Sequence, residues 1–590
     1  MTKAREDLET RVLKLETEVL ALRETIARLR STTAPPAPPP QAPEVEDASE
    51  DLLTWVGKSS LLPRLATISF LLVLALTLRT VTDNGMIGKQ VGAFLGMGYA
   101  ALLIAASWWQ YRRGSHLAPV FAACGGVLMF TIVVELQTRF HAISSMPAYL
   151  ILLLTGAALG GISYCHQVAL PVLVGSLGMC LAGVLIDYPN PFYPSLVILL
   201  LLANLLGAFA TRLQRCSWLR WILLLVTATV VQVWALKLVR GLHRGGKGAL
   251  AFSPEYFLPL LFLLFAAFLG VAVLAVLRRT SGRISRFDLA LPTITAVWAH
   301  AAAAPVIYAR FGNGLVLGWM GVFVAGVLLG FGVWLARRES AGVNAFAVAG
   351  TALGLLTLPA ALESLLASLP FAGVFALLLA HWAQQWRNGF LRLLSYLVQI
   401  YACGTLLYLL WDAAAAGFVP SALAAGILAA TAFWHFRWCR THPPTEGAVF
   451  FSPFDRQDAT AIFLLLAALA NGFFLPRTTL YHALQLNGGD ILAPFHGGQS
   501  VLINVTAAVL LWFSLRRRNR EIRNVALLLT LIGAGKVFLF DLFSFRGAPL
   551  VLAVFSFGLT VSLLSLCLAR WTRLAEDPPA SAAKPPVTEA

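Results

Sequence analysis

Charged side chains are scarce in this sequence. They make up 12% of the 590 residues, whereas hydrophobic residues make up 58%. Soluble domains contain about 25% charged residues, so the composition excludes an ordinary water-soluble fold. Acidic residues are fewer than basic ones: 28 Asp and Glu stand against 44 Lys and Arg, which gives a net charge of +16. The basic residues form short clusters between apolar runs of about twenty residues. This pattern predicts a membrane protein and no nucleic-acid partner.

Cysteine motifs are missing as well. None of the seven cysteines belongs to a CxxC pair or has metal-ligand spacing to a histidine. The sequence therefore predicts no metal and no cofactor. No cleavable signal peptide is expected either, because the N-terminal residues are charged and the first apolar run begins near Leu61.

Residues 1–31 have the heptad pattern of a cytoplasmic coiled coil. Leu at the d positions and mostly β-branched residues at the a positions favour a parallel two-stranded coil, so we expect a homodimer through this segment. A lone amphipathic helix on the membrane is the alternative. Residues 32–51, with PPAPPPQAP and an acidic stretch, are expected to form a semi-rigid linker. The apolar heptad positions are Leu8, Val12, Leu15, Val19, Leu22, Ile26 and Leu29.

Residues 52–571 are predicted to form a polytopic transmembrane domain, followed by a disordered cytoplasmic tail at 572–590. The predicted fold class is all-α, with about eighteen apolar segments that are long enough to cross a bilayer. Their approximate spans are 61–80, 91–111, 117–136, 146–164, 168–186, 192–211, 218–236, 256–277, 288–308, 314–336, 343–362, 369–386, 390–411, 417–436, 459–475, 499–515, 524–542 and 548–571.

The basic residues also predict the orientation. Lys and Arg are retained on the cytoplasmic side of a membrane, and alternate loops, such as 112–113, 337–338 and 516–523, are richer in them. Both termini are therefore expected in the cytoplasm. One loop with Lys237 and Arg240 opposes this orientation.

Three helix ends share an aromatic residue followed by basic residues, at 108–113, 334–338 and 512–518. The apolar segment after each carries a carboxylate near its outer end, namely Glu135, Glu363 and Asp541. We therefore hypothesise an internal repeat with three outer-end carboxylates at similar depth, and chance similarity between apolar segments is the alternative. Glu135 also has the i, i+4 spacing to Arg139 that favours a local ion pair.

Ionisable residues inside an apolar segment are the first candidates for function, because their insertion is costly. Lys536 and Asp541 lie in the segment 524–542. Five residues correspond to about 140° of rotation on an α-helix, so we expect no direct pair between them. Lys536 then either snorkels to the interface or joins Arg546 in a site for an anion or a lipid headgroup.

The stretch RRRNREIRNV from Arg516, followed by GKVFLFDL from Gly535, resembles the closing signature of the bacterial membrane-protein family catalogued as domain of unknown function 2339. The N-terminal coil, the Pro-rich linker and LTWVGK at 53–58 are similar to that family in style. The resemblance implies a bacterial inner membrane and a long series of helices, and it brings no mechanism.

Three functional classes fit the sequence. A transporter or flippase for a lipid-linked or small anionic substrate fits the helix count and the scattered prolines, which could break helices around a site; these are Pro171, Pro259, Pro292, Pro305 and Pro359. A non-catalytic scaffold would recruit a partner through the coiled coil. A membrane enzyme for lipid-linked sugars or acyl chains would use an outer loop, predicted from Pro476 to Gly498. Its candidate groups are Glu135, Asp187, His482, Asp490 and His496.

Overall fold

The computed structural model describes residues 67–74, 76–77, 80, 84, 88–188, 193–213, 217–243, 254–278, 285–340, 342–412, 417–444, 458–486, 491–544 and 546–576. These residues form helices and their connections, without a strand, which confirms the all-α class for this part of the chain. The predicted coiled coil, the linker and most of the first apolar segment lie outside the described residues. The predicted tail also lies outside them from residue 577 onward, and residues 572–576 are helical.

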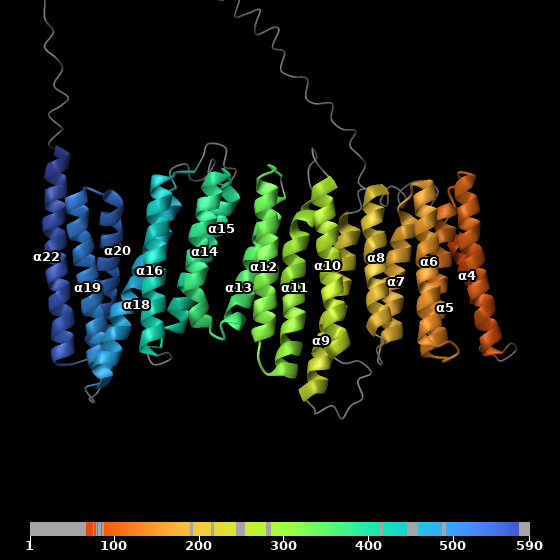
Figure 1. The fold of residues 1–590 in the computed structure, drawn as a ribbon, viewed down its shortest axis with the longest axis horizontal. Coiled ribbons are helices and arrows are strands. Elements are labelled where there is room, and N and C mark those ends of the chain that lie inside the picture. Colours follow the sequence, from red (N-terminus) through yellow and green to blue (C-terminus); the bar gives the residue numbers. More distant parts are fainter. Residues whose placement is uncertain are drawn as a thin grey trace, which may run out of the picture. The chain divides into compact units, whose positions relative to one another are not determined.

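The chain divides into two compact units, residues 1–230 and 231–590. Within the first unit, neighbouring helices run up and down beside one another (Figure 1). They are α4 (Lys89–Arg112), α5 (Ala118–Thr138), α6 (Ser145–His166), α7 (Leu170–Asp187), α8 (Tyr193–Leu213) and the first part of α9 (Ser217–His243).

The second unit begins inside α9 and contains the remaining helices. In order they are α10 (Pro254–Arg278), α11 (Arg286–Phe311), α12 (Leu315–Ala336), α13 (Val343–Ala361), α14 (Leu365–Gln385), α15 (Gly389–Leu409), α16 (Phe418–Thr441), the 3₁₀ turn η1 (Ala459–Ala461) with α18 (Ile462–Leu486), α19 (Leu492–Arg517), α20 (Arg520–Lys536), the π-helix η2 (Val537–Asp541), α21 (Leu542–Ser544) and α22 (Ala548–Glu576).

Seventeen helices in the described part of the chain are long and apolar enough to cross a membrane. Each coincides with one predicted apolar segment, and the remaining segment, 61–80, is the one that lies largely outside the described residues. Large apolar side chains are exposed along these helices, with Leu102 68%, Phe323 72% and Leu531 69% exposed. A soluble protein rarely exposes so much apolar surface, whereas in a bilayer these side chains contact lipid.

The prolines do not break the helices as the sequence suggested. Pro171 lies in the first turn of α7. Backbone N–H groups in the first turn have no acceptor within the helix, so the absence of an N–H in proline is tolerated there. Four others, Pro259, Pro292, Pro305 and Pro359, lie inside helices that continue past them. No described site is therefore built from helices interrupted at these prolines.

The predicted outer loop from Pro476 to Gly498 is also wrong. Helix α18 continues to Leu486 and α19 begins at Leu492, so only a short connection remains. Polar residues of this stretch, such as His482, belong to the last turns of a helix that is longer than its apolar core.

Four turns on the predicted cytoplasmic side have the same construction. In each, one residue after the helix has a left-handed conformation, and the N–H of the next residue donates to the carbonyl five positions earlier, at 2.8–3.2 Å. This is the Schellman arrangement. That next residue is Ser or Asn, and its side chain accepts from the N–H two positions on, which caps the following segment. The turns are centred on Gly114, Glu339, Arg387 and Arg518.

Three of these turns belong to the aromatic–basic helix ends that suggested a repeat. The fourth, at Arg387, follows a helix outside that set, so the shared feature is a way of turning between two helices. In two of the ends the guanidinium lies over the indole ring, with Arg113 at 3.4 Å from the Trp109 centroid and Arg338 at 3.9 Å from the Trp334 centroid.

Candidate functional site

The second unit holds a buried cluster around Lys536, the last residue of α20. Its Nζ donates to Asp541 Oδ1 at 3.0 Å, to Ser500 Oγ at 2.5 Å and to the carbonyl oxygen of His496 at 2.8 Å. An ammonium has three N–H donors, so each donor has a partner. Ser500 and His496 both lie on α19, and the cluster therefore joins α19 to α20.

The direct pair between Lys536 and Asp541 contradicts the sequence prediction, and the backbone explains why. Residues 537–541 form a π-helix, in which hydrogen bonds run from residue i to i+5. Residues five apart then lie nearer to one face of the helix than the about 140° of an α-helix allows. The π-helix brings the carboxylate onto the face of the ammonium.

The two charges of this pair differ in burial. The side chain of Asp541 is 1% exposed and that of Lys536 is 18% exposed. Ser500, itself fully buried, donates its hydroxyl to Asp541 Oδ2, so the serine bridges the two charges. The ammonium also lies 6.0 Å from the ring centroid of Phe540, which is 49% exposed. Lys536 is thus the less buried member of the pair.

A glycine allows α19 and α20 to approach beside this cluster. Gly533 lies about one turn before Lys536, and a methyl group in its place would overlap Oδ1 of Asn504 on α19. Asn504 in turn donates to Ser556 Oγ on α22 at 2.9 Å. The cluster therefore stands in a tightly packed group of three helices, which fixes its geometry.

The other predicted site residues are not part of the cluster. Arg546 is exposed beyond the end of α21, and the polar contacts of Lys536 and Asp541 described above do not include it. Glu135 pairs with Arg139 at 3.2 Å, as its i, i+4 spacing predicted. Glu363 is an exposed residue with φ 51° in the turn after α13. The three outer-end carboxylates thus have three different environments.

The enzyme candidates do not share one outer loop, and of them His496 contributes its carbonyl oxygen to the cluster. Asp187 is 1% exposed at the end of α7 and accepts from the hydroxyl of Tyr149 at 3.0 Å, so it is a buried group and not an outer-loop one. His482 and His496 lie within α18 and α19, and Asp490 lies outside the described residues. Among the described residues no group of three His, Cys, Asp or Glu could hold a metal ion.

A second polar feature, which the sequence analysis missed, follows one face of α15. Arg392, Ser395, Tyr396, Gln399 and Cys403 recur at helical spacing, and each is at most 5% exposed. A helix in a membrane normally turns its apolar residues to lipid and its polar residues to the bundle interior. The i, i+3, i+4, i+7, i+11 spacing of these polar residues was the signal in the sequence.

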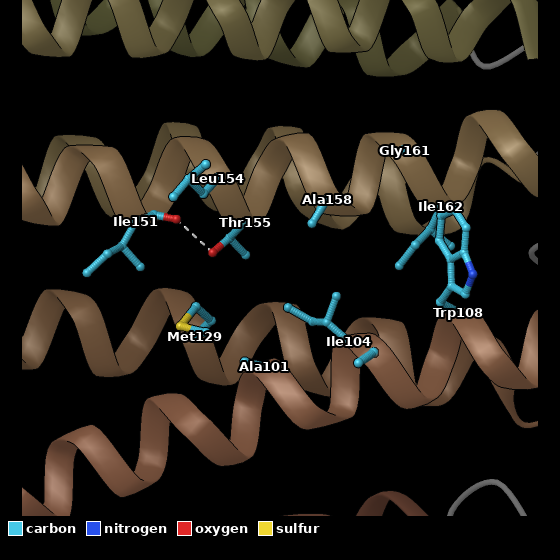
Figure 2. A pocket seen from close by; sticks show the side chains of 11 residues that line it. Ala101, Ile104, Trp108, Met129, Ile151, Leu154, Thr155, Ala158, Gly161 and Ile162 are labelled. Atoms are coloured by element: carbon cyan, nitrogen blue, oxygen red, sulfur yellow. Dashed lines mark hydrogen bonds between the residues drawn. The ribbon is translucent and has the colours of Figure 1, made fainter.

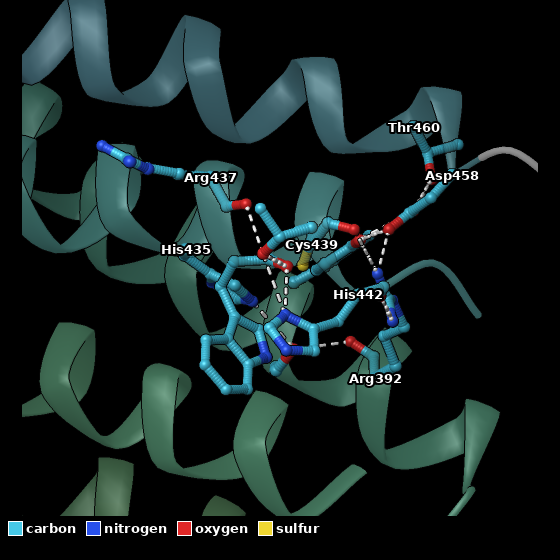
Figure 3. A network of polar contacts seen from close by, with 11 residues as sticks. Arg392, His435, Arg437, Cys439, His442, Asp458 and Thr460 are labelled. Carbon is cyan, nitrogen blue, oxygen red and sulfur yellow. Dashed lines mark hydrogen bonds and ion pairs between the residues drawn. The ribbon is translucent and has the colours of Figure 1, made fainter. Parts of the chain in front are cut away.

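The end of this stripe at the start of α15 is a closed ionic network (Figure 3). Arg392 forms an ion pair with Asp458 and donates to the carbonyl oxygens of His442 at 2.7 Å and Cys439 at 3.0 Å. Tyr396 donates to the same carboxylate at 2.6–2.7 Å. The network joins α15 to the end of α16 and to the residue before η1, and its charges are satisfied within the protein.

Neutral polar groups continue the stripe through the middle of the bundle. The hydroxyl oxygen of Ser395 lies 3.2 Å from Nε2 of His435 on α16. Gln399 donates to Oγ1 of Thr431, also on α16, at 3.4 Å and to the thiol of Cys403 at 3.5 Å. The midpoint of α15 therefore carries buried amide and hydroxyl groups.

The opposite end of α15 is capped by an arginine from α18. Arg477 donates to the carbonyl oxygens of Leu410 at 2.6 Å and Trp411 at 2.8 Å. Its guanidinium also lies 5.2 Å from the ring centroid of Phe495, the neighbour of His496. A helix C-terminus carries partial negative charge, so this arginine satisfies both hydrogen-bonding and charge requirements.

No protein-family model matches the chain, and no curated protein or solved structure is significantly similar to it. The similarity to the family catalogued as domain of unknown function 2339 stays a prediction from the quoted motifs.

Proposed function

We propose that this polytopic membrane protein is a transporter, or a lipid flippase, for an anionic substrate that engages Lys536. One observation carries the proposal: Lys536 lies inside a segment long and apolar enough to span a membrane, its side chain is 18% exposed, and its counter-charge comes from the same segment. Ionisable groups inside membranes are costly and mark substrate or ion pathways. A phosphate or carboxylate has the charge and the acceptor oxygens to replace Asp541 beside Lys536.

Charge balance extends this proposal to the proton. The pair is neutral, with one positive and one negative group, in a region of low dielectric constant. When a substrate anion takes the place of the carboxylate, the site would hold two negative charges and one positive charge, which is strongly unfavourable there. We infer that Asp541 binds one proton as the anion binds, so that neutrality is kept. Anion and proton then move together.

The geometry is less favourable for an enzyme. Ser500 and Lys536 lie as close as a nucleophile and its base. However, Lys536 is paired with Asp541 in its charged ammonium form. An ammonium has no lone pair, so it cannot act as the base that takes a proton from Ser500. The serine hydroxyl donates to the carboxylate and is fully buried. Both groups are therefore occupied in stabilising one another.

The test is transport by the purified protein in liposomes. Fluorescently labelled phosphatidylglycerol tests lipid flipping, with labelled phosphatidylcholine as the zwitterionic comparison, and radiolabelled phosphate tests transport of a small anion. We expect movement of one anionic probe, and Lys536→Met should slow it by about tenfold, the effect of one charge-assisted hydrogen bond. Lys237→Met, which removes a lysine near the Trp234 ring, is the matched control and should have no effect.

A second variant tests the role of the proton. Asp541→Asn keeps the size of the side chain but cannot exchange a proton, so we expect anion movement to continue without the accompanying change in internal pH. Equal rates for the protein, for Lys536→Met and for empty liposomes with all three probes would overturn the proposal. Anion movement that is unchanged in Lys536→Met would place transport elsewhere in the protein.

A further inference from the structure

An apolar groove lies in the first unit, between α4, α5 and α6 (Figure 2). Its volume is about 590 Å³, within the range of roughly 300–1,000 Å³ for ligand pockets. Small residues leave the space open: Ala101 and Ala105 on α4 and Ala158 and Gly161 on α6 line it. At Gly161 an added Cβ would meet no atom within 4 Å.

The lining of the groove is almost entirely apolar, so it is suited to a hydrocarbon chain. Thr155 is the hydroxyl residue of the lining, and its Oγ1 already donates to the carbonyl oxygen of Ile151 at 2.8 Å, as Figure 2 shows. Ile104, Met129 and Leu154 contribute further apolar surface. All three helices are long and apolar enough to span a membrane, so the surroundings of this groove are lipid chains.

One end of the groove is aromatic and basic. Trp108 lies at this end in Figure 2, beside Ile162. The guanidinium of Arg112 lies 5.5 Å from the Trp108 ring centroid, and His166 meets the same ring edge-on at 5.5 Å. Tryptophan is enriched at the level of the lipid headgroups, and basic residues between helices bind anionic headgroups. Arg112 is exposed and can therefore face a phosphate.

We propose that this groove binds one acyl chain of an anionic phospholipid, from the leaflet on the side of Arg112, with the phosphate of the lipid against that arginine. Apolar lining, aromatic rim and positive charge follow one another along the groove in the order in which a phospholipid presents its chain, its ester region and its phosphate. This site is in the first unit and is independent of the transport proposed at Lys536.

Native mass spectrometry of the full chain, released from nanodiscs of mixed phosphatidylglycerol and phosphatidylcholine, tests the proposal. We expect one phosphatidylglycerol to be retained preferentially. Ala158→Phe fills the groove and should abolish this retention. Ala157→Phe is the matched control, because Ala157 is the adjacent exposed alanine and is absent from the lining. Arg112→Gln should remove the preference for phosphatidylglycerol while total lipid retention is kept.

Three results would overturn the proposal: equal retention of both lipids by the unmodified protein, equal loss in the two phenylalanine variants, or a preference that survives Arg112→Gln. If another segment of this chain or a second copy fills the groove, Ala158→Phe would lower the thermal stability or change the oligomeric state while lipid retention stays constant. Both quantities are measured on the same samples.

Discussion

The second unit contains two buried ion pairs that are built in opposite ways. Arg392 and Asp458 come from different segments, their side chains are 6% and 0% exposed, and the arginine also binds carbonyls of α16. Lys536 and Asp541 come from one stretch of helix, and the lysine side chain is 18% exposed. The first pair closes a junction between helices, and the second leaves the side chain of its lysine less completely buried.

The difference shows that burial alone does not identify a functional charge in a membrane. A guanidinium with a fixed planar fork satisfies several acceptors at once and is suited to a permanent junction. An ammonium on a flexible stem can change partners at lower cost. In our proposal the lysine pair is therefore the exchangeable, functional one, and the arginine pair, which has more contacts, is the structural one.

The largest effect should come from breaking the structural pair. Asp458→Asn leaves Arg392 buried without its counter-charge, so we expect the free energy of unfolding to fall by about 3–5 kcal/mol. Equilibrium unfolding in a denaturing detergent measures this change. Replacing both residues, as Arg392→Met with Asp458→Leu, should recover much of the loss, because no lone charge remains. A loss below about 1 kcal/mol for Asp458→Asn would contradict a junction role for this pair.

A smaller effect is expected at the exchangeable pair. Lys536→Met leaves Asp541 with the Ser500 hydroxyl, so the expected loss is about 2–3 kcal/mol. A double-mutant cycle with Asp541→Asn measures the coupling between the two side chains. Coupling close to zero would show that the two charges do not pair. In contrast to the structural pair, transport by Lys536→Met should be impaired under conditions where the variant is folded.

The smallest effect should come from the exposed pair in the first unit. Glu135 and Arg139 are 25% and 63% exposed, and helix-surface pairs at this spacing contribute about 0.3–0.5 kcal/mol. Glu135→Gln should therefore leave unfolding nearly unchanged and should become indistinguishable from the parent protein at high salt. A larger change would mean that the Glu135 carboxylate contributes more to stability than this exposed ion pair.

The helices could be predicted from the sequence because a membrane restricts the backbone conformations that a spanning segment can adopt. Inside a bilayer the backbone must satisfy its own hydrogen bonds, so runs such as 91–111 and 343–362 become helices with ends near those of the apolar runs. The Glu135–Arg139 pair was predictable for the same reason, since it depends on ordinary helical spacing. The end of α18 was not predictable from hydrophobicity, because its last turns are helical although they contain polar residues.

The site at Lys536 could be predicted in part. The cost of an ionisable group in an apolar run singled out Lys536 and Asp541, but their pairing depends on a π-helix that ordinary α-helical geometry does not anticipate. The Arg392 network was missed because its charges are far apart in the sequence. Arg392 lies near a helix start, where a basic residue suggests snorkelling, and Asp458 lies some 66 positions further on. Only the folded chain brings them together.

The turn at Arg387 has a consequence for how the chain tolerates insertions and deletions. Its hydrogen bonds fix both the last turn of α14 and the first residues of α15. If the turn kept these hydrogen bonds, one added residue would shift the sequence of α15 by one position and rotate its faces by about 100°. Arg392 and Gln399 would then face hydrocarbon, although neither residue had been altered. The length of this connection is therefore part of what specifies the interior of the bundle, and variation in loop length should be confined to connections that lack this turn.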